Sequence, residues 1–188
     1  GVAVGAHPSY PDREGFGRRA WAATPDQIAP WVTQQIEALA EIAARKGMRL
    51  AHVKPHGALY NGAAQQEAIA AAIAQAVKEW DANLILLGLS GSHLIEAGRS
   101  AGLMVMQEVF ADRRYQPGGQ LVSRETPCAL ITDPEAAAEQ AYALAHHQPI
   151  VALDGSPVRL AADTLCLHSD TPGAIGIARA VAKAVNRG

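Results

Sequence analysis

The feature that most constrains the fold of this chain is the repeated order of a short apolar segment followed by an amphipathic helical segment. The apolar segments have the length and aliphatic content of buried strands, and they cover residues 2–6, 50–53, 84–87, 103–109 and 164–167. Five strand-then-helix units predict an α/β fold with a parallel sheet. A complete (β/α)8 barrel has about 250 residues. The sequence therefore predicts an incomplete (β/α) TIM-like barrel that forms a single domain over residues 1–188.

The start of the chain adds to this expectation. Residue 1 is glycine, and the first strand-like segment begins at Val2 without a preceding helix or cap. A parallel strand needs neighbours on both sides and helices over both faces of its sheet. We therefore expect an N-terminally truncated barrel whose first strands are missing, with an exposed apolar edge beside residues 2–6.

Several local signals place the helices and one hairpin. Thr24 followed by Pro25 has the residue types of an N-cap and a first helical position, which predicts a helix start. A second helix is predicted over residues 64–80, and Thr171 is predicted to cap the last helix. Two short apolar segments flank Asp154-Gly155, which indicates a β-hairpin and a departure from strictly alternating strands and helices.

The segment that follows the second strand concentrates polar chemistry. Lys54, His56, Tyr60 and Asn61 occur within eight residues, directly after the apolar residues 50–53. Pro55 cannot continue a strand ladder, and Gly57 lets the backbone bend away. In parallel α/β proteins ligands bind at the carboxyl ends of the strands. Holding a lysine there is costly unless an anion pairs with it, so this segment predicts a binding site.

The other strand ends carry polar residues as well. They present His7 with Asp12, Ser90 with Ser92, Glu108 with Asp112 and Arg113, and His168 with Asp170. If the fold is a barrel, these side chains line one cleft, and His7, Lys54, His56, Glu108 and His168 converge on one face of the sheet. The alternative is that such residues cap helices or remain solvated. For Ser90, Ser92 and Asp170 that structural role is the stronger interpretation.

Composition excludes several classes of protein. The net charge of −2 offers no electrostatic attraction for nucleic acid or an anionic membrane. Only Cys128 and Cys166 are present, which disfavours a disulfide framework and suits a reducing cytoplasm. No apolar run approaches the roughly 20 residues that span a bilayer. A small-molecule substrate or a protein partner fits better than a nucleic acid or a membrane, and a homo-oligomer is left open.

Common catalytic and nucleotide motifs do not fit. Residues 15–20 match GxGxxA but do not connect a strand directly to a helix, and the Walker pattern is absent. Residues 88–92 miss the nucleophile elbow GxSxG because residue 92 is serine. A metal site would have to gather His7, His56 and His168 from three strand ends, so whether a metal binds is left unknown.

Four long motifs carry a resemblance to a known family. They are Gly5-Ala-His-Pro-Ser-Tyr-Pro-Asp-Arg-Glu-Gly-Phe-Gly-Arg-Arg19, His52-Val-Lys-Pro-His-Gly-Ala-Leu-Tyr-Asn61, Glu108-Val-Phe-Ala-Asp-Arg113 and Asp170-Thr-Pro-Gly-Ala174. Together they resemble the LamB/YcsF family, the A subunits of ATP-dependent 5-oxoprolinase, over the whole chain. Two motifs with which the family usually begins are absent, Asn-Cys-Asp-Leu-Gly-Glu and Gly-Phe-His-Ala-Gly-Asp. Ser169 also stands where the family commonly has glycine.

The resemblance implies an activity. It is hydrolytic opening of the lactam ring of 5-oxoproline to glutamate, coupled to ATP hydrolysis and carried out with two other subunits. It also implies a barrel of the glycoside hydrolase and polysaccharide deacetylase type. Because the chain lacks a Walker motif, we expect the partner subunits to bind the nucleotide. Two alternatives are a stand-alone metal-dependent amidase or deacetylase, and a non-catalytic scaffold subunit marked by a large exposed apolar patch.

Residue type and position then suggest roles. Ring opening needs a cation for carboxylate and phosphate, a base for water and donors for the tetrahedral intermediate. Lys54 and Arg113 are predicted to hold anions. His56 or His168 is predicted to act as acid or base, and Asp12, Glu108 or Asp170 as a base or orienting carboxylate. His7, Tyr60 and Asn61 are predicted to bind substrate.

Overall fold

The computed structural model describes residues 1–186. The chain divides into two compact units, Gly1–Met106 and Gln107–Gly188, which we call the first and second units and describe separately. The expectation of a single domain remains a prediction. None of the described helices is long and apolar enough to cross a membrane.

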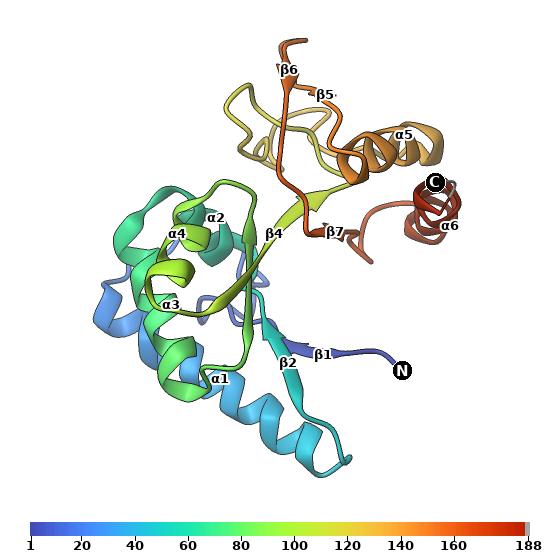
Figure 1. The fold of residues 1–188 in the computed structure, drawn as a ribbon. Helices are drawn as coiled ribbons and strands as arrows, with labels where there is room; N and C mark the ends of the chain where they lie inside the picture. Colours follow the sequence, from blue (N-terminus) through green and yellow to red (C-terminus); the bar gives the residue numbers. More distant parts are fainter. Residues whose placement is uncertain (187–188) are drawn as a thin grey trace. The chain divides into compact units, whose positions relative to one another are not determined.

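The first unit alternates strands and helices. Its elements are β1 (Val4–Ala6), α1 (Pro25–Ala44), β2 (Leu50–Val53), α2 (Gly57–Gln65), α3 (Glu67–Trp80), β3 (Ile85–Leu89) and α4 (His93–Ser100). Strand β2 pairs in parallel with both β1 and β3. Helix α3 packs against α1 and α4 (Figure 1). Their apolar faces form a core that contains Ile28, Val32, Ile36, Ile73 and Val77.

The second unit is built around the end of one strand. Strand β4 (Met104–Phe110) begins in the first unit and pairs in parallel with β7 (Thr164–Cys166). The remaining elements are α5 (Pro134–Ala145), β5 (Ile150–Val151), β6 (Pro157–Val158) and α6 (Ala174–Val185). Helices α5 and α6 pack on each other, with Ala137, Ala141, Ile177 and Val181 in their core (Figure 1).

The strands confirm the α/β class. Five strands are hydrogen-bonded in the order β1-β2-β3-β4-β7, as an incomplete parallel barrel requires. All five lie within two residues of the strands expected from the sequence. The antiparallel pair β5 and β6 confirms the hairpin at residues 154–155, and Pro25 begins α1 after a capping box at Thr24.

Two helix predictions were wrong. The helix expected over residues 64–80 is two helices, α2 and α3, because Gln66 adopts an extended conformation between them. Helix α2 begins as early as Gly57. Its φ of 61° is a backbone conformation that glycine adopts readily and other residues do not. The last helix is capped by Gly173 rather than Thr171, since the Thr171 hydroxyl donates to the Asp112 carboxylate instead.

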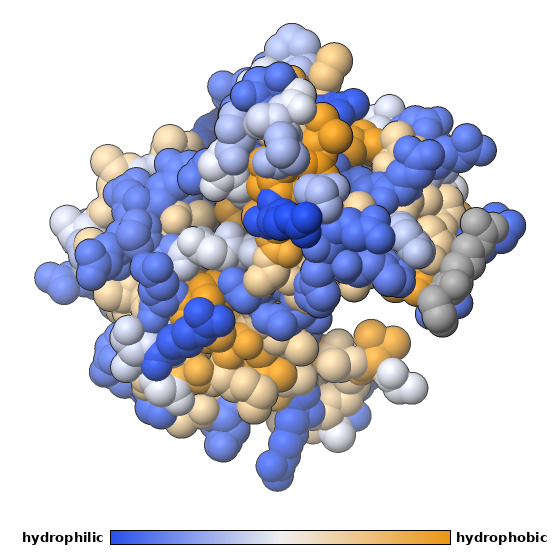
Figure 2. Space-filling view, turned by 45° about the horizontal axis from the view of Figure 1, so that its top comes forward, coloured by the Kyte–Doolittle hydropathy of each residue, from blue (hydrophilic) through white to orange (hydrophobic). Residues whose placement is uncertain are grey.

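Exposed apolar side chains are distributed over several elements. Strand β1 is an edge strand in the hydrogen-bonding order, and Val2 beside it is 90% exposed, as expected for an apolar edge. Ile42, Met104 and Ile175 are also exposed. On the face seen in Figure 2, hydrophobic residues are interspersed with hydrophilic ones.

Candidate functional site

In the first unit, the loop after β1 is attached to the turn after β2 by backbone hydrogen bonds. The N–H of Lys54 donates to the carbonyl of Ala6 at 2.9 Å, and the N–H of His56 donates to Pro8 at 2.8 Å. The N–H of Ala58 donates to the Gly17 carbonyl at 2.8 Å. These bonds hold two segments about 40 to 50 residues apart in the sequence against each other, so side chains from both reach one place.

Two glycines allow this close approach. A Cβ on Gly57 would collide with the Gly17 carbonyl, and a Cβ on Gly17 would meet the Ser9 side chain at 2.6 Å. Both residues have positive φ, of 61° and 66°. Any other residue at either position would therefore suffer backbone strain as well as a clash. Gly57 thus fixes where the loop lies, beyond letting the chain bend.

His7 and His56 are brought into direct contact by this arrangement. His7 Nδ1 donates to the Lys54 carbonyl at 2.6 Å, and His56 Nε2 donates to the Phe16 carbonyl at 2.8 Å. The other two ring nitrogens, His7 Nε2 and His56 Nδ1, are 3.0 Å apart. The His56 ring also packs edge-on against the Phe16 ring, with centroids 5.1 Å apart. All four ring nitrogens of the pair are therefore engaged.

The other predicted residues of the first unit have different surroundings. Lys54 Nζ lies 5.9 Å from the centre of the Tyr60 ring, and Tyr60 itself is buried. Asn61 is exposed on α2. Buried Asp12 accepts a hydrogen bond from the Gly15 N–H at 2.8 Å and lies 3.8 Å from Arg19. Asp12 thus shapes the loop of residues 12–17.

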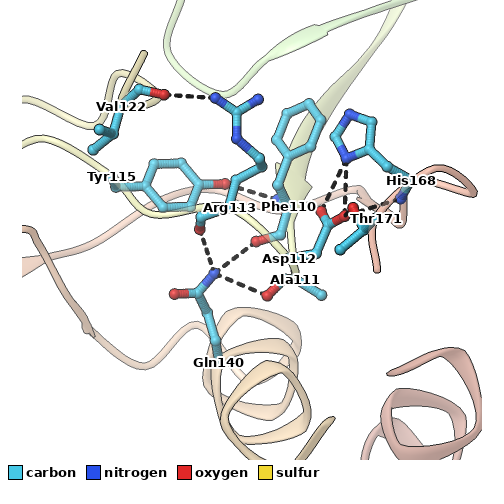
Figure 3. Close-up of polar contacts among 9 residues, drawn as sticks. All are labelled: Phe110, Ala111, Asp112, Arg113, Tyr115, Val122, Gln140, His168 and Thr171. Carbon is cyan, nitrogen blue, oxygen red and sulfur yellow. Dashed lines mark hydrogen bonds and ion pairs between the residues drawn. The ribbon is translucent and has the colours of Figure 1, made fainter. Parts of the chain in front are cut away.

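In the second unit, a buried carboxylate orients a histidine (Figure 3). Asp112 follows β4 and is buried, and its Oδ1 accepts from His168 Nδ1 at 3.0 Å. Its Oδ2 accepts from the backbone N–H of His168 at 3.2 Å and from the Thr171 hydroxyl at 2.6 Å. Burial alone would raise the pKa of Asp112, but the hydrogen bonds and charge of His168 and the bond from Thr171 outweigh it and lower that pKa.

The carboxylate sets the tautomer of His168. Since Nδ1 donates to Asp112, Nε2 of a neutral ring has a free lone pair, and it points away from Asp112 (Figure 3). The Phe110 ring stacks on the His168 ring, with centroids 5.4 Å apart and planes at 15°, which holds the imidazole in place. A buried carboxylate, an oriented imidazole and an available Nε2 form an arrangement suited to a general base or acid.

Arg113 is a buried cation beside this pair. Its side chain makes one hydrogen bond, from a terminal nitrogen to the Val122 carbonyl at 2.6 Å (Figure 3). Its Nε is buried without a partner, and within residues 1–186 no carboxylate lies within ion-pair distance. Burial, together with the charge of Arg124, lowers the pKa of Arg113 to about 10. An unmatched guanidinium of this kind is suited to a carboxylate or phosphate ligand.

Tyr115 and Gln140 hold the turn after β4. The Phe110 N–H donates to the Tyr115 hydroxyl at 2.7 Å, and burial raises the pKa of this fully buried tyrosine. Gln140 on α5 donates through Nε2 to the carbonyls of Phe110 and Arg113, each at 2.8 Å (Figure 3). The backbone on both sides of Asp112 is therefore fixed from a helix.

We expect Gln140→Leu to destabilise the protein by about 1–3 kcal/mol, because it removes the amide that donates to the carbonyls of Phe110 and Arg113. Leucine has a similar size and loses only the amide. Urea unfolding measures the change. Glu139→Leu, at the exposed neighbouring position on α5, is the control and should change stability by less than about 0.5 kcal/mol. Equal effects of the two variants would show that Gln140 does not hold this turn.

The structure groups the predicted residues in two sets. His7, Lys54 and His56 lie together in the first unit. In the second unit Arg113 lies beside Asp112, which accepts a hydrogen bond from His168. Glu108 is buried on β4, opposite Thr164 of β7. Asp170 is exposed between β7 and α6. Convergence of the two sets on one face remains a prediction. Within residues 1–186, no three His, Cys, Asp or Glu side chains are placed to hold a metal ion.

Sequence reasoning underrated Asp112, Thr171 and Gln140. The strand-end pattern includes Asp112 but favours Glu108 as the carboxylate of that strand. The adjacent charges of Asp112 and Arg113 directly after a buried strand were the available signal. Nothing in the sequence links Gln140 to this turn, because its role depends on how α5 packs.

Comparison with known proteins identifies the relatives of this chain. A model of the LamB/YcsF family matches residues 1–188. The chain belongs to the LamB/YcsF family. A protein from Chloroflexus aggregans that is named as the A subunit of 5-oxoprolinase is 52% identical over 181 residues, which cover 96% of this chain and 72% of that protein. A protein of the same name from Methylococcus capsulatus is 54% identical, and the match covers 95% of this chain and 69% of that protein.

A solved structure is similar as well. The crystal structure of a lactam utilization protein from Thermus thermophilus matches this LamB/YcsF chain with a TM-score of 0.91 and 46% identity. The match covers 100% of this chain and 74% of that one. The resemblance inferred from the four sequence motifs is thereby confirmed at the level of the family.

Proposed function

We propose that this protein opens the lactam ring of 5-oxoproline to glutamate, coupled to ATP hydrolysis, as one component of a multi-subunit enzyme. Its relatives are named as the A subunit of 5-oxoprolinase, and the similar solved structure is of a lactam utilization protein. The observation that carries the proposal is the buried Arg113, which lacks a matching carboxylate and lies beside the Asp112–His168 pair. Both 5-oxoproline and a phosphorylated intermediate are anions.

The chemistry explains why these groups are useful. A five-membered lactam is a poor electrophile. Transfer of a phosphoryl group to its oxygen makes the ring carbon a better electrophile, so water adds to that carbon. The carbon–nitrogen bond then breaks to leave an acyl phosphate, and a second water releases phosphate from it to give the glutamate carboxylate. In this mechanism His168 Nε2 takes a proton from the attacking water, and Asp112 stabilises the imidazolium that forms. Arg113 in the second unit and Lys54 in the first are each proposed to bind a carboxylate or phosphate group.

We also propose which subunit binds which substrate. The chain has no Walker motif, so we assign the nucleotide to two partner subunits and the lactam to this one. We further propose that the five-stranded sheet belongs to a barrel of the glycoside hydrolase and deacetylase type. The test is glutamate release from 5-oxoproline and ATP, measured with the complete set of subunits and with each omitted in turn. Undiminished release without this protein would refute the proposal.

Lys54 supplies a specific prediction. Lys54→Ala should remove a charge-assisted hydrogen bond of roughly 1.5–3 kcal/mol and lower kcat/KM for 5-oxoproline by about ten- to more than a hundred-fold. Lys54→Arg should recover part of the loss if the charge is what matters. Lys46→Ala, which removes an exposed lysine after α1, is the control. Wild-type kinetics for Lys54→Ala would assign anion binding to other residues.

A further inference from the structure

The contacts of His7 and His56 determine how many protons the two rings carry. His7 Nδ1 faces the Lys54 carbonyl at 2.6 Å, and His56 Nε2 faces the Phe16 carbonyl at 2.8 Å. A carbonyl oxygen can only accept a hydrogen bond, so each of these two nitrogens carries a hydrogen. The outer bonds therefore use the single N–H that each neutral imidazole possesses.

The inner contact then requires one more proton. His7 Nε2 and His56 Nδ1 are 3.0 Å apart, a hydrogen-bonding distance. In two neutral rings both of these nitrogens would present lone pairs, which repel each other at this distance. A third hydrogen between them turns the repulsion into a hydrogen bond, and the two rings together then carry one positive charge.

We propose that His7 and His56 form one acid–base unit that holds a single shared proton. When a substrate separates the inner nitrogens, one ring presents an N–H and the other presents a lone pair. The pair then supplies an acid and a base side by side. His7 is the more exposed of the two rings, while His56 is also packed against Phe16, so His7 is the ring that moves.

The surrounding charges fit a site that meets an anion. The segments that contact the pair carry Lys54 after β2 and Arg18, Arg19 and Asp12 in the loop. The Arg18 guanidinium lies 5.3 Å from the centre of the Phe16 ring, whose edge contact holds His56. The positive charges of Lys54 and Arg18 oppose a further positive charge on the pair. The hydrogen bonds to two backbone carbonyls stabilise the charged pair.

The role of the pair in ring opening rests on the proposed function. When the lactam carbon–nitrogen bond breaks, the bond electrons go to the ring nitrogen, which needs a proton to leave as an amine. The shared proton is transferred to that nitrogen, and the pair becomes neutral until it takes a proton from water. The attacking water loses its own proton to a base, so water adds across the bond that breaks.

The proton count can be measured directly in the intact protein labelled with ¹⁵N-histidine. At about pH 7.5, roughly one unit above the ordinary histidine pKa of about 6.5, a lone imidazole is mostly neutral. We expect His7 Nδ1 and His56 Nε2 to be protonated, and the two inner nitrogens to show shifts between the protonated and unprotonated values. His7→Asn and His56→Asn assign the signals.

Two spectra would overturn the proposal. Inner nitrogens that are both unprotonated would show two neutral rings. Unprotonated inner nitrogens whose signals shift when EDTA is added would show instead that a metal ion lies between the rings. This experiment needs no turnover, so it separates failure of the pair from failure of the proposed function, which would appear as absence of glutamate release.

Kinetics with the complete enzyme test whether the two rings act together. His7→Asn retains a side-chain N–H for the Lys54 carbonyl and removes the inner nitrogen. Each single variant should lower kcat by about 10²- to 10⁴-fold, and the double variant should fall no further than the worse single variant. If the loss of kcat in the double variant equals the product of the two single losses, the rings work independently. The control is His147→Asn, because His147 is exposed and its φ of 54° suits asparagine.

Discussion

Replacing Asp112 by asparagine should lower kcat for 5-oxoproline by about 10²- to 10⁴-fold. The asparagine amide can donate to His168 Nδ1, which would place the ring hydrogen on Nε2 and remove the base. The substitution also removes the negative charge that stabilises an imidazolium on His168. The assay is glutamate release by the complete enzyme, with Asp26→Asn on the exposed first turn of α1 as control. If kcat stays within about twofold of wild type, the Asp112–His168 pair is structural.

The same variant carries a pH-dependent stability signature. Hydrogen bonds from His168 and Thr171 outweigh burial and lower the pKa of Asp112 below its unfolded value. A lowered carboxyl pKa stabilises the fold at pH values above the unfolded pKa, and this contribution is lost as the pH falls through the folded pKa. The stability difference between wild type and Asp112→Asn should therefore be largest near neutral pH and shrink in acid. Urea unfolding over a pH series measures this, and a constant difference would contradict it.

Arg113→Met should have opposite effects on activity and stability. Loss of a charge-assisted bond to the substrate or phosphate should lower kcat/KM by about ten- to more than a hundred-fold. The folded protein should be no less stable, and we expect a higher Tm, because methionine fills the site without burying an unmatched charge. Activity assays and thermal unfolding of the same preparation measure both effects.

Two further variants define what Arg113 does. Arg113→Lys keeps the charge and should recover part of the activity, but not the geometry of a two-point contact. Arg179→Met, at an exposed position of α6, is the control for removal of an arginine and should change neither property. A lower Tm together with unchanged kinetics for Arg113→Met would show that Arg113 serves the fold through its bond to Val122.

The sequence by itself determined the class of fold and the places where chemistry occurs. Strands, helix starts and the hairpin depend on local patterns, such as apolar runs, Thr24 followed by Pro25, and Asp154-Gly155. The ends of the strands also follow from local patterns, so His7, Lys54, His56, Arg113 and His168 could be selected as site residues. Two helix predictions are wrong because a tertiary contact prevails over the local pattern. Thr171 binds a buried carboxylate instead of capping α6, and α2 begins at Gly57 where that glycine meets Gly17.

Only the tertiary structure decided which side chains meet. His168 and Asp112 are 56 positions apart, and His7 and His56 are 49 apart. A sequence pattern predicts which residue stands at the end of a strand. Which side chain it contacts on a neighbouring strand depends on the register of the strands and on how each loop packs. The same holds for the unmatched charge of Arg113, since burial and the absence of a nearby carboxylate within residues 1–186 are properties of the packed second unit. Hydrogen bonds act over about 3 Å, so the protonation and tautomers of these histidines follow from three-dimensional contacts alone.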